Sequence, residues 1–172
     1  MADAQRHSTD WRQGHVLHPE AAESLGLVWD PDPAATFVVM VSHDCDIAAA
    51  VEREPDVEFI VGRRIEAPGA DTHAKTARRL HIVFDGADGT TAVELLATHK
   101  ARVPKQAALA TAPHSGWKLS PESLATLQHW LAARYRRAAF ADEFETRLKS
   151  KPGLLDKKIA KALVTCPHSP CH

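Results

Sequence analysis

The sequence predicts an α+β domain with a mostly antiparallel, barrel-like sheet of about five strands, followed by C-terminal helices. Short runs rich in β-branched residues are concentrated between residues 37 and 103, whereas helical periodicity and capping residues dominate after residue 120. Strands in one block and helices in the next are typical of α+β proteins. The length of 172 residues and the apolar share of 44% suit one domain with one core.

The strand predictions rest on apolar runs that end at turn residues. Residues 37–41 read Phe-Val-Val-Met-Val, and the absence of polar alternation predicts a strand buried on both faces. Runs at 57–62, 80–84 and 90–96 follow. The turn signal at 85–89 joins the last two runs, so we expect a hairpin there. A short fifth strand is expected at 101–103.

Two helix starts are well marked in the sequence. His18-Pro19-Glu20 opens a short helix that Gly26 ends, because proline suits the first helical position and an acid suits the positive end of the helix dipole. Ser120-Pro121-Glu122 opens a longer helix with an apolar stripe, which we expect to run to about residue 136. Further helices are predicted at 142–151 and 154–164.

The chain is predicted to contain a disordered N-terminus over residues 1–10, one α+β domain over 11–164, and a Cys/His-rich tail over 165–172. It has neither an apolar run of about 18 residues nor a secretory leader, so we expect a cytoplasmic protein without a membrane segment. An odd count of three cysteines argues against a disulfide framework.

The segment Ser42-His43-Asp44-Cys45-Asp46 follows the best strand and carries the chemistry-bearing residues of the sequence. If the extended backbone continues, His43 and Cys45 share one face, and Asp44 and Asp46 share the other. Imidazole and thiolate are zinc ligands, whereas the two carboxylates suit magnesium or the start of a helix. His81 is a third candidate metal ligand, because an unpaired imidazole inside an apolar strand would be costly.

These residues are compatible with several functions. The first is a zinc-binding module that engages nucleic acid or a protein partner, and the second is a metal-dependent nuclease or hydrolase in which Asp44 and Asp46 are catalytic. The third is a metal-free interaction protein, in which the aspartates cap a helix and Cys45 is a small buried residue. A thiolate nucleophile at Cys45 is disfavoured, because the neighbouring carboxylates raise its pKa. The tail either completes the metal site or binds metal adventitiously.

Basic residues lie in pairs at the ends of predicted strands and are candidate nucleic-acid contacts, with Trp117 or Tyr135 available for stacking. These pairs are Arg63 with Arg64 and Arg78 with Arg79. The net charge of −1 and the sparse aromatic residues equally suit ordinary solvated surfaces. The sequence lacks a phosphate-binding glycine loop, a dinucleotide fingerprint, His-Glu-x-x-His and Gly-x-Ser-x-Gly, which argues against nucleotide-dependent enzymes and common hydrolases.

The run 37–46, an apolar strand that ends in Ser-His-Asp, resembles the Val-Val-Val-Ser strand of the small SH3-like barrel ribonuclease toxins. Residues 12–16, Arg-Gln-Gly-His-Val, are similar to their opening Arg-Gly-Asp-Ile strand, with Gly14-His15 where Gly-Asp is usual. Residues 100–109 fall where their final strand would lie. The resemblance implies a barrel-like fold, does not include the cluster around Cys45, and assigns no activity to the chain.

Overall fold

The computed structural model describes residues 9–133, which lie in one compact unit of the chain. Several predictions fall on residues outside this range. They are most of the disordered N-terminus, the end of the α+β domain with its helices at 142–151 and 154–164, and the tail at 165–172.

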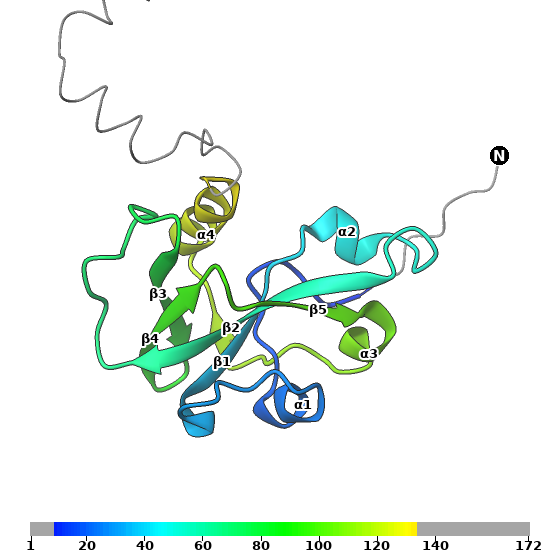
Figure 1. Ribbon diagram of the computed structural model, residues 1–172, viewed down its shortest axis with the longest axis horizontal. Coiled ribbons are helices and arrows are strands. Elements are labelled where there is room, and N and C mark those ends of the chain that lie inside the picture. The colour runs from blue at the N-terminus through cyan, green and yellow to red at the C-terminus, as the bar shows by residue number, and fades with distance from the viewer. Residues whose placement is uncertain (1–8, 134–172) are drawn as a thin grey trace, which may run out of the picture. The chain divides into compact units, whose positions relative to one another are not determined.

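The strands form one antiparallel sheet in the order β1-β2-β4-β3-β6, and β5 pairs with β2 outside this order, at the other end of β2 from β4 (Figure 1). The sheet curls into a half-barrel, which confirms the predicted α+β fold with an antiparallel, barrel-like sheet. The strands are β1 (Thr36–Met40), β2 (Asp56–Ile65), β3 (Arg79–Gly86), β4 (Gly89–Leu96), β5 (Lys100–Pro104) and β6 (Trp117–Lys118).

The curl is centred on β2, which changes partner along its length. Its first half pairs with β5 through Asp56–Ile60, and its second half pairs with β4 through Arg63–Ile65. Gly62 lies where the partner changes, and a Cβ there would stand 2.6 Å from Leu95 Cδ2 and 2.7 Å from the carbonyl oxygen of Glu94. The missing side chain therefore lets β2 and β4 approach closely at the bend.

The predicted helices at both ends of the described chain are confirmed. They are α1 (Pro19–Ser24) and α4 (Pro121–Ala133), and between them lie the 3-10 turn η1 (Pro33–Ala35), α2 (Asp44–Ala48) and α3 (Lys105–Leu109). The sequence did not predict α3 or β6, because both are short and are stabilised by tertiary contacts instead of local signals. None of the helices in the described range has the length and apolar character needed to cross a bilayer.

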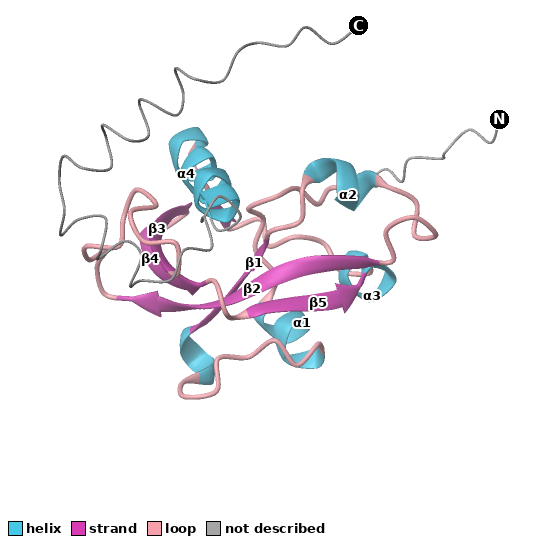
Figure 2. Cartoon of the chain, turned by 45° about the horizontal axis from the view of Figure 1, so that its top comes forward, coloured by secondary structure: helices cyan, strands magenta, loops and turns pink. Residues whose placement is uncertain are grey.

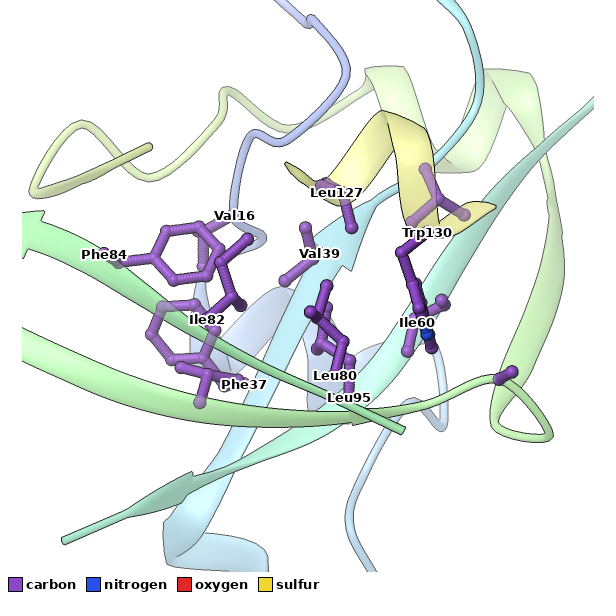
Figure 3. Close-up of a cluster of buried hydrophobic side chains, with 13 residues drawn as sticks. Val16, Phe37, Val39, Ile60, Leu80, Ile82, Phe84, Leu95, Leu127 and Trp130 are labelled. Carbon is purple, nitrogen blue, oxygen red and sulfur yellow. The ribbon is translucent and has the colours of Figure 1, made fainter. Parts of the chain in front are cut away.

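Apolar side chains form two clusters, one on each face of the sheet. The first lies beneath α4, where Leu127 and Trp130 pack on strand residues that include Val39 and Leu80 (Figure 3). The second includes residues of α1, α2 and α3. Helix α1 lies on the side of the sheet away from α4 (Figure 2). Residues of β1 alternate between the two clusters, which confirms the prediction that this strand is buried on both faces.

The outer edge of β1 is covered by the N-terminal segment. The N–H of Gly14 donates to the carbonyl of Met40 at 2.8 Å, and the N–H of Leu17 donates to the carbonyl of Val38 at 2.9 Å. This segment therefore protects an apolar strand edge that would otherwise present unpaired backbone groups. It also places residues 12–15 beside the loop that follows β1.

Replacing Gly62 with alanine is expected to lower the free energy of unfolding by about 1–3 kcal/mol, because backbone and Leu95 must shift to admit the new methyl group. Urea denaturation followed by tryptophan fluorescence measures this change. Gly26→Ala is the comparison for backbone strain without crowding, since Gly26 has φ +69 and no atom of the described residues lies within 4 Å of the added Cβ. A Gly62→Ala variant as stable as wild type would contradict the packing argument.

Candidate metal site at the end of β1

The first two residues of the loop after β1, Val41 and Ser42, form hydrogen bonds with β2. The N–H of Val41 donates to the carbonyl oxygen of Glu58 at 2.9 Å, and the N–H of Glu58 donates to Ser42 Oγ at 2.8 Å. Ser42 thus continues the ladder with its side chain at the point where the strand ends. The residues that follow start from a fixed position.

The backbone does not stay extended after Ser42, so the predicted alternation of faces over residues 43–46 is wrong. His43 is the N-cap of α2, and its side chain accepts the N–H of Cys45. Asp44 and Asp46 lie in the first turn, where negative charge is favourable at the positive end of the helix. The segment therefore forms a helix instead of extending the strand, because it supplies both the N-cap residue and the acidic residues of the first turn.

The two predicted ligands nevertheless meet. His43 Nδ1 lies 3.1 Å from Cys45 Sγ, and both side chains are exposed. Cys45 Sγ in turn lies 3.4 Å from Asp46 Oδ1. The hydrogen bond to the Asp46 carboxylate raises the pKa of the Cys45 thiol, and the negative charge of Asp46 acts in the same direction. Cys45 is a free thiol, and it is exposed, not buried as the metal-free alternative expected.

The carboxylate of Asp44 contacts the N-terminal segment, whereas that of Asp46 contacts Cys45. Its Oδ1 accepts the N–H of Gln13 at 2.8 Å, and Gln13 Nε2 donates to the carbonyl of Val41. Gln128 on α4 completes the contact, because its Nε2 donates to Gln13 Oε1 at 3.0 Å. The N-terminal segment, the end of β1 and α4 are therefore joined through one glutamine.

Lys105 forms hydrogen bonds to the backbone of α2. Nothing in the sequence indicated this role for the lysine. Its side chain is only 1% exposed. Its Nζ donates to the carbonyl oxygens of Asp46 at 2.6 Å and Ala49 at 3.0 Å. These carbonyls belong to the C-terminal half of α2, so the ammonium group caps the negative end of the short helix.

A cavity of about 550 Å³ opens beside His43 and Asp46. Its walls carry four carboxylates and two cationic groups. Lys100 Nζ lies 2.6 Å from Glu58, and Arg102 lies 3.0 Å from Asp56, which leaves Asp46 and Glu54 without a salt bridge within residues 9–133. The excess of negative charge makes the cavity a favourable environment for a cation.

The structure places His81 in a separate polar cluster. His81 Nδ1 accepts the N–H of Gly69 at 2.8 Å, and Nε2 lies 3.1 Å from Glu94 Oε2. Glu94 is 4% exposed and also contacts Arg63 at 2.8 Å and Arg79 at 3.4 Å. No contact in the described range joins His81 to His43 or Cys45. The sequence feature that could have indicated this cluster is Glu94, the one acidic residue within the apolar run 92–96.

The arginine pairs are largely occupied by contacts within the protein. Besides the bonds of Arg63 and Arg79 to Glu94, Arg63 lies 5.6 Å from the ring of Trp29. Arg64 lies over the rings of Phe37 and Trp117, at 5.7 Å and 5.9 Å. Arg78 is exposed, and its carbonyl accepts the N–H of Ala97 at 2.9 Å. The assignment of these residues to nucleic-acid binding stays a prediction.

The structure defines an α+β protein with a curled antiparallel sheet and an exposed His–Cys pair at one strand end. The chain matches no family model, none of the curated proteins compared with it and none of the solved structures. The resemblance to ribonuclease toxins therefore stays a hypothesis. Within residues 9–133, no group of three or more His, Cys, Asp or Glu side chains is arranged to hold a metal ion.

Replacing Asp46 with asparagine is expected to lower the pKa of Cys45, because the carboxylate that raises it is removed. The rate of alkylation by iodoacetamide at pH 7.5 should increase several-fold, since the thiolate is the reactive form. Rates measured from pH 6 to 10 give the pKa directly. Asp44→Asn is the matched control, because its carboxylate faces Gln13. Equal acceleration in both variants would show that Asp46 has no specific effect on the thiol.

The free energy of unfolding is expected to decrease at acid pH, because Glu94 becomes protonated and loses its ionic contacts. Burial alone would raise the pKa of its carboxyl group, but the bonds from His81 and Arg63 outweigh burial and lower it from 4.5. A pKa that is lower in the folded state contributes stability above about pH 5, and this contribution is lost as the pH falls through the folded-state value.

Glu94→Gln is therefore expected to be less stable than wild type at pH 7, by about 1–3 kcal/mol, with the difference narrowing below pH 4. Urea denaturation across this pH range measures the effect. Glu54→Gln, at an exposed position, should match wild type throughout. A difference between Glu94→Gln and wild type that is independent of pH would contradict the argument.

Proposed function

We propose that this protein is a metal-binding module in which His43 and Cys45 hold a zinc ion at the mouth of the acidic cavity. The observation that carries the proposal is the 3.1 Å contact between an exposed imidazole nitrogen and an exposed thiol. Two protein ligands leave two tetrahedral positions for water, a substrate or a group from another molecule. His81 is not part of this proposal, because both of its ring nitrogens have partners elsewhere.

The distance between the two donor atoms suits zinc after a small adjustment. Tetrahedral angles with Zn–N near 2.0 Å and Zn–S near 2.3 Å place the two donors about 3.5 Å apart. The observed separation of 3.1 Å requires a side-chain movement of about half an ångström. Metal binding at Nδ1 would replace the long 3.4 Å contact of that atom with the N–H of Cys45.

The charge around the pair favours a divalent cation. Asp46 lies 3.4 Å from the thiol and raises its pKa, so the thiolate forms readily only when a positive charge compensates for it. A zinc ion supplies that charge and displaces the thiol proton. Since a reducing compartment keeps Cys45 as a thiol, the proposal also places the protein in the cytoplasm.

A metal-dependent hydrolase or nuclease is the second candidate, and the cavity of about 550 Å³ beside the pair favours it. A substrate in this cavity would reach the open positions of the metal, and Asp46, which lines the cavity, would be available as a general base. Asp44 is less suited to catalysis, because it accepts the N–H of Gln13.

The partner of the module is proposed to be nucleic acid or another protein. Arg64 is the predicted contact that best suits nucleic acid, because its guanidinium already stacks on Trp117 at the protein surface. An arginine on an aromatic ring offers both a phosphate contact and a stacking platform.

The experiment that tests the metal site is a zinc titration of the full chain against a competing chelator dye, with the tail cysteines replaced (Cys166→Ser and Cys171→Ser) in every protein compared. The proteins are this background, called wild type here, and its variants His43→Ala, Cys45→Ser and His129→Ala. We expect one zinc per chain in wild type, at least tenfold weaker binding in the first two variants, and no change in the exposed-histidine control. Affinity should increase with pH, because the raised thiol pKa makes zinc compete with a proton. Cobalt substitution should give a thiolate charge-transfer band that Cys45→Ser abolishes.

Equal zinc binding in wild type and in the double variant His43→Ala/Cys45→Ser would overturn the proposal. The titration also separates the two candidate functions. If chelation lowers the Tm, the metal is structural; if chelation or Asp46→Ala removes a phosphodiesterase activity while the Tm is unchanged, the metal is catalytic.

A further inference from the structure

A second cavity, of about 630 Å³, lies on the other side of the loop that follows β1. It is bounded by the N-terminal segment, residues 112–119 and the start of α4, and its volume is in the range of small-molecule sites. Gln13 and Gln128 line both cavities, and the hydrogen bond between them separates the two. This second cavity is called the Arg12–Lys118 pocket below.

One side of the Arg12–Lys118 pocket presents positively charged donors that the protein leaves unused. Arg12 Nη1 donates to the carbonyls of Thr9 and Trp11, both at 2.7 Å. The remaining guanidinium N–H groups have no partner in the described range, and neither does the ammonium group of Lys118. Both side chains are exposed, so they are available to a ligand.

His15 adds a third donor between them. Its Nδ1 accepts the N–H of Arg12 at 3.2 Å. Burial, followed by the charge of Arg12, lowers the pKa of His15; Lys118 also lowers it, whereas Asp44 and Asp10 raise it. The ring is therefore neutral at pH 7 with its proton on Nε2, which has no partner within residues 9–133.

Part of the lining of the pocket is apolar. Trp117, Leu119 and Leu124 line it, and all three are half-buried. The ring of Trp117 also contacts Phe37 edge-on, with centroids 6.0 Å apart, and lies 5.9 Å from the guanidinium of Arg64. The part of this side chain that lines the pocket, together with the two leucines, offers an apolar surface to an aromatic ring.

The carboxylates at the pocket do not cancel its cationic side. Asp44 already accepts the N–H of Gln13 at 2.8 Å, and this bond satisfies part of its charge. Asp10 is exposed at the outer end of the segment. Neither carboxylate forms a salt bridge with Arg12 or Lys118 within residues 9–133, so the donors of Arg12, His15 and Lys118 stay available to a ligand.

We propose that the Arg12–Lys118 pocket binds a small planar aromatic anion. The ring lies against Trp117, Leu119 and Leu124, and the anionic group accepts hydrogen bonds from Arg12, Lys118 and His15. An aromatic carboxylate and a nucleoside monophosphate share this chemistry. The proposal does not involve His43 or Cys45, so it stands or falls independently of the metal site.

The test uses 2-naphthoate as the probe and 2-naphthamide as its neutral counterpart. Titrations of the full chain are followed by NMR at the indole N–H of Trp117. We expect saturable binding of naphthoate in a 1:1 complex, and at least tenfold weaker binding of the amide. Arg12→Gln and Lys118→Gln should each weaken naphthoate binding about tenfold, corresponding to about 1.4 kcal/mol. Arg102→Gln, which alters the acidic cavity instead, should leave it unchanged.

A third probe, adenosine 5′-monophosphate, distinguishes the two sources of the ligand. Displacement of naphthoate by the nucleotide supports the pocket and assigns it to nucleotides; binding of naphthoate without displacement assigns it to aromatic carboxylates. Equal affinity for naphthoate and naphthamide would overturn the proposal, because only apolar adsorption would be left. Unchanged affinity in both Arg12→Gln and Lys118→Gln, with Tm values like wild type, would also overturn it, as would failure of both anions to bind.

Discussion

Strands β2 and β4 approach each other closely at Gly62, and this contact sets the bend of the sheet. Without a Cβ at this position, Leu95 packs directly against the backbone, and β2 leaves β5 for β4 within a few residues. The sheet curls as a result, and an apolar cluster forms on each face. Strand curvature at a glycine is a general way of closing a sheet around a core.

The curl of the sheet also brings several polar side chains into hydrogen-bonding contact with one another. Glu94 lies directly across from Arg63 on one side and His81 on the other, because β4 runs between β2 and β3. A buried carboxylate is costly to desolvate, and these neighbours offset that cost with close hydrogen bonds. Residues that look available for metal or phosphate binding in the sequence thereby stabilise the sheet.

The end of β1 has a different character, because the regular pairing with β2 gives way there to a side-chain contact from Ser42. The chain then forms a short helix. At its N-terminus the side chain of His43 accepts a backbone N–H, and towards its C-terminus Lys105, which is distant in the sequence, donates to a backbone carbonyl. The loop is thus well supported while His43 and Cys45 stay exposed. Cavities on both sides of it, separated by the glutamine pair Gln13 and Gln128, offer two chemically distinct environments: one is acidic, and the other combines cationic donors with an apolar wall.

Local sequence patterns were enough to predict the fold class, the order of the main strands and helices in the described range, and the position of the His–Cys pair after a strand. These follow from local properties, namely apolar runs, proline at helix starts and turn residues after β3. Three features depend instead on the folded arrangement: His81 faces Glu94, Lys105 caps α2, and Arg12 and Lys118 line one pocket. Such contacts depend on strand register and on the bend at Gly62, which bring together residues distant in the chain, and no local pattern encodes those distances.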